Sequence, residues 1–265
     1  MGAVKAVTST QLQPRANILG IELDRLDMRE TIARCEEIIA RRAPSQHLAV
    51  SATNIVALHD DPKLREVARS CALVSADGLG VVWASRLLGN PLPERVNAMD
   101  LMERLFEVAE EKGYRIFFLG ATDEVLEVAA ARLRERHPRL VIAGYRNGYY
   151  GAAEDDSVID EVRAAKPDIL FAAMPSPKKE YWLAQHRERL GVPLLIGVGG
   201  AIDVVAGHAR RAPLWVQRSG FEWLYRMVQE PRRLARRFLV GNAKFLYLLA
   251  AALMTRRRSR VRRLM

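Results

Sequence analysis

Two kinds of hydrophobic periodicity alternate along this chain, and the alternation limits its fold more than any other feature. Short runs with strand character are expected at His47–Ser51, Ala72–Ser75, Arg115–Leu119, Leu140–Ala143, Asp168–Ala173 and Pro193–Val198. Longer segments with helical spacing flank them, among them Leu26–Arg42, Glu124–His137, Val158–Ala165 and Glu180–Leu190. Strands joined through helices need crossover connections, so the chain is predicted to form an α/β fold with a mostly parallel, Rossmann-like sheet and helices on both faces.

The expected strand ends direct attention to a small part of the chain. Ligands of parallel sheets bind beyond the carboxyl ends of the strands. The segments at those ends are Thr53-Asn54, Asp77-Gly78, Gly120-Ala121, Gly144–Tyr150, Pro175–Glu180 and Gly199–Asp203. We expect the functional site to be built from these segments.

Positive charge is concentrated at the carboxyl end of the chain. From His208 to Met265 there are fifteen Arg and Lys residues and two acids, whereas residues 1–207 carry a net charge of −3 within a total of +10. We therefore expect an α/β core over residues 1–207 and a helical, basic appendage over residues 208–265. Pro231, preceded by Glu230, is typical of a helix start, so two helices are predicted to meet there.

The appendage also carries a ten-residue apolar run, Phe245–Met254, followed at once by a cluster of arginines. Ten helical residues cover about 15 Å, half of a bilayer core of about 30 Å, so the run is expected to lie on a membrane rather than to cross it. An anionic membrane surface is favoured, with a solvated helix end or a nucleic-acid patch as alternatives. Residues 1–15 show no secretory signal and no run of eighteen apolar residues occurs, which predicts a location on the cytoplasmic side.

Several common phosphate and metal motifs are missing from the sequence. Neither G-x-G-x-x-G after the first strand nor G-x-x-x-x-G-K-[ST] occurs, which argues against a dinucleotide or P-loop enzyme. The five histidines lack ligand spacing, and no Asp-x-Asp pair could hold a divalent ion on a diphosphate. We expect neither a metal nor a cofactor, so fixed cations would have to neutralise a diphosphate. Cys35 and Cys71, each in a periodic apolar segment, are expected to be reduced core residues.

Several sequence blocks occur in an order that is typical of one protein family. They are Ala76-Asp-Gly78, Glu94-Arg95-Val96 with Asp100-Leu101, Phe117-Phe-Leu-Gly-Ala121, Gly144 with Gly148-Tyr149, Pro177-Lys178 with Glu180 and Trp182, Gly197-Val-Gly-Gly-Ala-Ile-Asp203, Ala206-Gly207, Arg211-Ala-Pro213, Phe221-Glu-Trp-Leu-Tyr-Arg226 and Glu230-Pro-Arg232. With these blocks the chain resembles the WecG/TagA/CpsF glycosyltransferase family from about Asn17 to Phe245.

The resemblance implies a hexosyltransferase that depends on a UDP-sugar. The best-known members transfer N-acetylmannosamine or its uronic acid, with inversion and without a metal, onto N-acetylglucosamine linked to a lipid diphosphate. The expected partners are therefore a UDP-sugar donor, a polyprenyl-diphosphate-linked saccharide acceptor and the inner face of the cell membrane, in cell-envelope polysaccharide synthesis. The basic appendage and the missing Asp-x-Asp pair agree with this independently.

Three residues match catalytic positions of the family. Asp77 resembles the base that takes the proton of the acceptor hydroxyl, and its structural alternative is a helix N-cap. Asn54 resembles the asparagine that orients the substrate, with a plain turn as its alternative. Arg95 resembles a pocket arginine, with a surface ion pair as its alternative.

The substrate-binding positions come from the same match. Tyr149 and Asp203 are expected near the uracil and ribose, with a capping aromatic and an N-cap as their alternatives. The other expected contacts are Thr53 and Gly120 at strand ends, and the arginines that would bind the diphosphate, Arg226, Arg233 and Arg236.

Three departures from the family pattern lie at the edges of the expected site. Ala52 stands where Thr is common, and Asn97-Ala98 stands where Thr-Gly is usual. Lys179 replaces a Gln, and it is expected to meet a uronate carboxylate, the diphosphate or solvent. The donor sugar, the acceptor, the polymer and the oligomeric state, including a homo-oligomer, therefore stay open.

Two other functions compete with this one. An inactive module with the same fold could bind a membrane surface or nucleic acid, but the presence of Asp77, Asn54 and Arg95 argues against it. A nucleotide-dependent enzyme of another reaction type would need the phosphate motifs that are missing. An active transferase, with no nucleic-acid partner, is the expected function.

Overall fold

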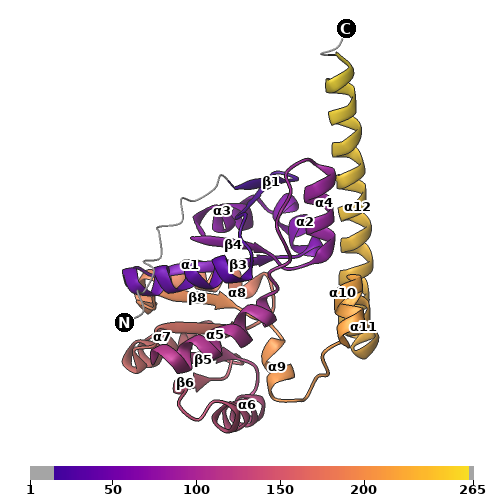
Figure 1. Cartoon of the computed structure of the whole chain (residues 1–265). Helices are drawn as coiled ribbons and strands as arrows, with labels where there is room; N and C mark the ends of the chain where they lie inside the picture. The colour runs from indigo at the N-terminus through magenta and orange to yellow at the C-terminus, as the bar shows by residue number, and fades with distance from the viewer. Residues whose placement is uncertain (1–14, 263–265) are drawn as a thin grey trace, which may run out of the picture.

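A computed structural model describes residues 15–262, apart from the side chains of Arg233 and of residues 257–262. The predicted α/β fold is confirmed. A six-stranded sheet has the order β4-β3-β8-β7-β5-β6, and its neighbouring strands are all parallel (Figure 1). The strands are β3 (Ser45–Val50), β4 (Leu73–Ala76), β5 (Arg115–Gly120), β6 (Val141–Arg146), β7 (Ile169–Ala173) and β8 (Leu194–Gly197).

Helices connect the strands of the core, and polar caps define several of their starts. Asp27 forms a capping box with Glu30 at the start of α1 (Met28–Arg41). The side chains of Ser51, Asp61, Asn97 and Thr122 cap α2 (Ala52–Asp60), α3 (Pro62–Ser70), α5 (Ala98–Lys112) and α6 (Asp123–Arg136). The other core helices are α4 (Leu79–Leu87), η1 (Ala152–Glu154), α7 (Asp155–Ala165), α8 (Lys178–Leu190) and α9 (Ala201–Val205).

Two parts of the fold were not predicted. The strands β1 (Ala16–Ile18) and β2 (Ile21–Leu23) form an antiparallel hairpin around Leu19 and Gly20, whose φ angles are +55° and +86°. Strands of three residues are too short to show a period, so this hairpin left no clear pattern. The second part that was not predicted is helix α5. Its sequence does carry a helical pattern, because Asn97 caps the helix and its buried residues recur at helical spacing.

Successive side chains of the central strands bury opposite faces of the sheet. Ile116 and Phe118 of β5 pack with α1, α5 and α6, whereas Phe117 and Leu119 pack with α7 and α8. The prediction of helices on both faces is therefore confirmed. Cys35 and Cys71 are free, buried thiols, as predicted, and burial raises the pKa of each to about 12.

Gly120, the last residue of β5, lies where the core has no room for a side chain. Its φ is +124°, and a Cβ there would lie 2.5 Å from the carbonyl carbon and oxygen of Ala173. We expect Gly120→Ala to lower the free energy of unfolding by about 2–4 kcal/mol, because it adds overpacking to backbone strain. Urea titration measures this loss.

Gly113→Ala is the matched control for that measurement. Gly113 also has a positive φ, of +72°, but a Cβ added there would have no atom within 4 Å. The control should therefore cost less stability than Gly120→Ala. Equal losses in the two variants would contradict the role given to the contact with Ala173.

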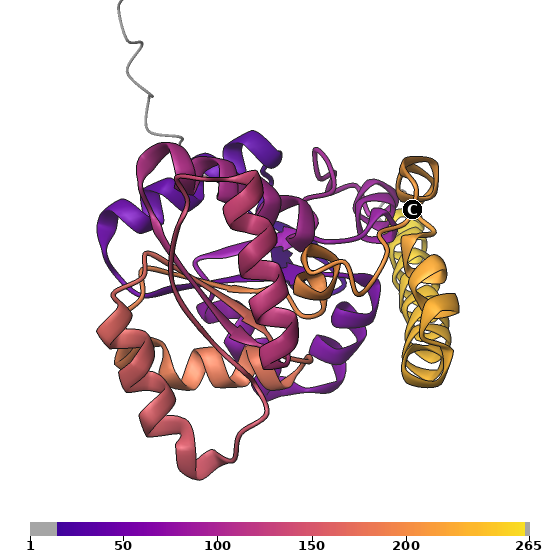
Figure 2. The same ribbon diagram turned by 90° about the horizontal axis from the view of Figure 1, so that it is seen from below.

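The carboxyl-terminal part of the chain is helical, as predicted. It contains α10 (Leu214–Ser219), α11 (Glu222–Gln229) and α12 (Pro231–Arg262), and the last two are separate helices that meet at Pro231. Figure 2 shows α12, in yellow, lying beside the core and outside the layers of the sheet. In Figure 1 its last turns project beyond the core.

One face of α12 is fixed to the core. Phe245 and Leu249 are buried in an apolar cluster that includes residues of α2, and Lys244 Nζ lies 2.5 Å from Asp60 Oδ2. A Cβ at Gly241 would lie 2.7 Å from Thr53 Cγ2, so the glycine permits the close approach of α12 to α2. The division into a core and an independent tail stays a prediction, and cutting the chain after Gly207 would uncover this cluster.

The structure corrects the length argument made for the apolar run. Because α12 continues without a break, its segment Leu234–Arg256 has 23 residues and a mean hydropathy of 1.6, enough by length and composition to cross a membrane. Length therefore does not decide between lying on a membrane and crossing it, and attachment at the surface stays a prediction. Only 11% of the most apolar part of this segment is buried. Among the side chains that the structure describes, the large apolar ones exposed on α12 are Leu239, Val240, Leu246, Tyr247 and Met254.

Candidate active site

The expected site residues lie along the edge of the sheet where its parallel strands end. Asp77 directly follows β4, and Asn54 lies in the first turn of the helix after β3. Lys179 and Asp203 lie in the first turns of the helices after β7 and β8. Parallel pairing therefore brings these residues to one edge, although they are distant in the sequence.

Asp77 contacts the start of α5, a helix that begins 21 residues later in the sequence. Its Oδ1 accepts a hydrogen bond of 3.0 Å from the backbone N–H of Ala98, in the first turn of α5. The N-cap position of α4 is Gly78, and among the described residues no side chain makes a capping hydrogen bond there. The N-cap alternative for Asp77 at α4 is therefore not what the structure shows.

The environment of Asp77 favours a carboxyl group that readily takes up a proton. Burial raises the pKa of Asp77, the hydrogen bond from Ala98 lowers it, and the nearby Glu222 carboxylate raises it again. The positive charges of Arg95 and Lys179 lower the pKa of Asp77, and the net direction is upward. An upward shift of the Asp77 pKa agrees with the general base expected from the sequence, because a stronger base takes up a proton more readily.

Asn54 is integrated into the start of α2. Ser51 caps this helix by accepting a hydrogen bond of 3.3 Å from the Asn54 backbone N–H, and its hydroxyl donates to Asn54 Oδ1. The Ser51 hydroxyl also lies 3.1 Å from Thr53 Oγ1. The methyl group of Thr53 faces Gly241 of α12, so the expected contact residues Thr53 and Asn54 lie where the appendage crosses the core.

Arg95 lies in an ion-pair network rather than free in a pocket. Its side chain is 16% exposed, with Nη1 2.8 Å from Glu222 Oε2 and Nη2 3.1 Å from Asp100 Oδ2. The ion-pair alternative is therefore present, but one of the partners comes from the appendage. Arg211 joins the same network through Asp100 and through Glu222 Oε1, at 3.6 Å from its Nε.

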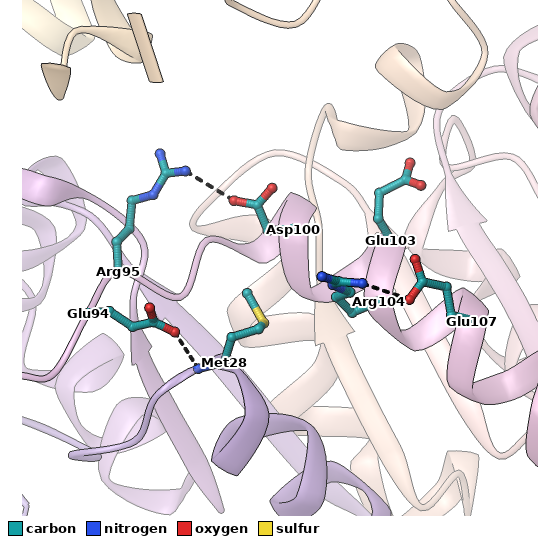
Figure 3. Close-up of a pocket in the computed structure, with 7 residues that line it drawn as sticks. All are labelled: Met28, Glu94, Arg95, Asp100, Glu103, Arg104 and Glu107. Carbon is teal, nitrogen blue, oxygen red and sulfur yellow. Dashed lines mark hydrogen bonds and ion pairs between the residues drawn. The ribbon is translucent and has the colours of Figure 1, made fainter. Parts of the chain in front are cut away.

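The open pocket beside Arg95 does not include Asp77. Its volume is about 330 Å³, and Figure 3 shows Arg95 and Asp100 at one side of it. The residues that line it are Met28, Glu94, Arg95, Asp100, Glu103, Arg104 and Glu107. Four carboxylates against two arginines make this pocket unsuited to a diphosphate.

Lys179 pairs with its neighbour in the sequence and has little contact with solvent, whereas its expected contact with a uronate or the diphosphate stays a prediction. Its Nζ lies 2.5 Å from Glu180 Oε1, and only 12% of its side chain is exposed. Its aliphatic stem covers Gly197, where a Cβ would lie 2.6 Å from Lys179 Cε. The second oxygen of Glu180 is buried without a hydrogen-bond partner among the described residues.

Arg226 and Asp203 meet at the turn that follows β8. Arg226 Nη2 donates a hydrogen bond of 3.1 Å to the carbonyl of Gly200. A Cβ at Gly200 would lie 2.3 Å from that nitrogen and 3.0 Å from Asp203 Oδ2. Gly200 occupies the N-cap position of α9 and Asp203 lies inside the helix, so Asp203 is not an N-cap.

One expected contact lies far from Asp77. Tyr149 follows β6, at the opposite edge of the sheet from β4, and its side chain is 79% exposed. Five strand spacings separate these edges, about 24 Å at 4.8 Å per spacing. Arg236 is exposed on α12, and the Arg233 side chain lies outside the described residues.

The comparison with known proteins shows the family. The sequence profile of the glycosyl transferase WecG/TagA/CpsF family matches residues 16–259, nearly the whole chain.

The chain belongs to the WecG/TagA/CpsF glycosyltransferase family.

Its curated relatives include proteins of Staphylococcus aureus strains MW2 and MRSA252, both named N-acetylglucosaminyldiphosphoundecaprenol N-acetyl-beta-D-mannosaminyltransferase. Each is 31% identical over 242 residues, which cover 90% of this chain and 93% of the relative. A solved substrate-binding periplasmic protein of Ralstonia solanacearum matches 69% of this chain and 53% of its own, at 21% identity and a TM-score of 0.29, too distant to bear on the fold. The chain is a glycosyltransferase of cell-envelope polysaccharide synthesis.

Three charged residues of the site were not assigned a role from the sequence. Asp100, Arg211 and Glu222 all lie in blocks typical of the WecG/TagA/CpsF family, but the blocks do not reveal which side chains pair. The structure brings Asp100 and Glu222 to Arg95, and it brings Arg211 to Asp100 and Glu222. The sequence shows that each of these blocks contains a charged residue. Only the fold shows that the charged residues of different blocks contact one another.

Proposed function

We propose that this glycosyltransferase moves N-acetylmannosamine, its uronic acid or a related hexose from a UDP-sugar to a polyprenyl-diphosphate-linked saccharide. The transfer proceeds with inversion and without a metal. The observation that supports this best is Asp77, a carboxylate of raised pKa at the carboxyl edge of a parallel sheet in a chain of this family. The named relatives, which span nearly the same length, support the class of donor sugar and acceptor.

The chemistry assigned to Asp77 is general-base catalysis. Its carboxylate takes the proton of the acceptor hydroxyl as the oxygen attacks the anomeric carbon, and the bond from that carbon to UDP breaks. The hydrogen bond from Ala98 holds one carboxylate oxygen, which leaves the other for the acceptor. Asn54, one strand away, orients the bound sugar in this account.

The departing UDP is assigned to the turn after β8. Arg226 already reaches this turn through the carbonyl of Gly200, and Asp203 lies beside it. Charge-assisted contacts from arginines stabilise a diphosphate as negative charge develops on it. In this layout the nucleoside lies toward Tyr149 and the sugar toward Asp77, so the donor runs across the edge of the sheet.

We expect activity to survive removal of divalent ions. Arginines, including Arg226 and Arg236, take the place of the cation that an Asp-x-Asp motif would hold. Turnover in excess EDTA should stay within about twofold of the untreated rate, since no metal-dependent charge stabilisation is lost. A complete loss that added magnesium reverses would contradict this expectation.

The membrane contact is assigned to α12, with the enzyme on the cytoplasmic side. Its inner face is occupied by α2, whereas Leu246, Tyr247 and Met254 on its outer side are more than half exposed. The arginines that follow favour an anionic leaflet. The contacts of Phe245 and Leu249 with the core support attachment along the surface rather than a crossing of the bilayer.

A screen of UDP-sugars tests the proposed function. UDP release is measured with a lipid-diphosphate-linked N-acetylglucosamine acceptor and without it. Release that needs both the acceptor and UDP-N-acetylmannosamine or its uronic acid is the expected result. No release with any donor, together with intact vesicle binding, would instead identify an inactive membrane-binding module.

A further inference from the structure

Four charged side chains join the appendage to the core beside Asp77. Arg95 lies between Glu222, at 2.8 Å, and Asp100, at 3.1 Å. Arg211 contacts Asp100 and lies 3.6 Å from the second oxygen of Glu222. The two arginines and two carboxylates form a closed, electrically neutral ring, which we call the latch.

The latch connects segments that are far apart in the sequence. Arg95 and Asp100 flank the start of α5 in the core, Arg211 lies in the segment between α9 and α10, and Glu222 is the first residue of α11. Between 16% and 28% of each side chain is exposed. Ion pairs with this degree of burial are screened less by solvent than surface pairs. The loss of one member therefore leaves the charges of its partners without an opposite charge nearby.

The position of Glu222 on α11 links the latch to the diphosphate side of the site. Residues four apart lie on the same face of a helix, and Arg226 is four residues after Glu222. Glu222 contacts Arg95 on one side, while Arg226 reaches the Gly200 carbonyl on the other. A single helical turn therefore spans the site between the end of β4 and the end of β8.

We propose that Glu222 is a positioning residue that latches α11 onto the catalytic edge through Arg95 and Arg211, and that this contact sets a carboxylate beside Asp77. The first part rests on the geometry alone, and the second part rests on the proposed function. Docking of α11 brings a carboxylate near Asp77, and like charges favour the protonated form of a carboxyl group. The appendage thus places Arg226 and tunes Asp77 through the same contact.

Hydrogen exchange tests the latch without any need for activity. In the full-length protein, Glu222→Gln and Arg211→Gln should each raise the exchange rates of the α11 backbone amides by about tenfold or more. In the double variant, the α11 amides should exchange little faster than in the faster-exchanging single variant, because both changes break one contact network. Arg218→Gln is the matched control, since Arg218 is an exposed cation of the appendage outside the latch. Exchange in Glu222→Gln equal to that in the control would overturn the proposal.

The pH dependence of kcat/KM tests the effect on the base. Asp77 must be ionised to act, so kcat/KM falls on the acid side as the pH drops through the Asp77 pKa. Removing the Glu222 charge lowers the Asp77 pKa, so Glu222→Gln should move the acid limb to lower pH. If the acid side of the pH profile stayed in place while kcat/KM fell at every pH, Glu222 would have only a structural role. That result would overturn the proposed effect of Glu222 on Asp77. If the wild type transfers no sugar, the proposed function fails, while the exchange experiment still decides the latch.

Discussion

Asp77→Asn is expected to lower turnover by about 10²- to 10⁴-fold, the usual contribution of a general base. The amide cannot accept the proton of the acceptor hydroxyl. Its oxygen can still accept the hydrogen bond from Ala98, so the fold and the binding of UDP should change little. Steady-state UDP release measures the loss, and thermal unfolding with UDP titration checks the two properties that should be retained.

The control for this variant is another aspartate changed in the same way. Asp160, on the exposed side of α7, has a side chain that is 74% exposed. Asp160→Asn should turn over at the rate of the wild type. If Asp77→Asn kept more than about a third of wild-type turnover, far above the loss expected for a missing base, another residue would have to take the proton.

Replacing the terminal arginines with glutamine is expected to release the enzyme from anionic vesicles. The changed residues are Arg256, Arg257, Arg258, Arg260, Arg262 and Arg263. At about 1 kcal/mol for each of the six arginines near an anionic surface, the partition constant should fall by roughly 10⁴-fold. Vesicle sedimentation at several salt concentrations measures this, and the steep salt dependence of the parent should flatten in the variant.

A reciprocal variant separates membrane binding from catalysis. Arg233→Ala should bind vesicles like the parent and lose turnover, because the resemblance assigns this arginine to the diphosphate. Its side chain lies outside the described residues, so the expectation rests on the sequence. A fully active Arg233→Ala variant would contradict this division of roles. So would a variant without the terminal arginines that still binds vesicles like the parent.

The sheet was predictable because its strands obey a simple rule. Strands buried on both faces read as short apolar runs, and the helices between them force parallel pairing, so all six strands can be located from the sequence. The β1–β2 hairpin was missed because strands of three residues carry too few positions to show a period. The continuous course of α12 was missed because Gly241 and Lys244 interrupt the apolar pattern without interrupting the helix.

The site was predictable in its location but not in its pairings. The expected strand ends placed Asp77, Asn54 and Asp203 at the carboxyl edge of the sheet, where the structure has them, since strand ends fix which loops meet. Which charges pair depends on packing between distant segments. Lys179 lies against Glu180, its neighbour in the sequence, and its side chain is only 12% exposed. Arg95 likewise shares its charge with Glu222 from the appendage, a contact that no local pattern indicates.

The stereochemistry of the product tests the central claim most directly. The enzyme is incubated with UDP-N-acetylmannosamine and a lipid-diphosphate-linked N-acetylglucosamine, and the isolated product is examined by mass spectrometry and NMR. The account predicts an acceptor extended by one sugar whose anomeric configuration is opposite to that in the donor, because the hydroxyl activated by Asp77 attacks from the face away from UDP. An extended product with the donor's configuration would contradict direct attack with Asp77 as the base.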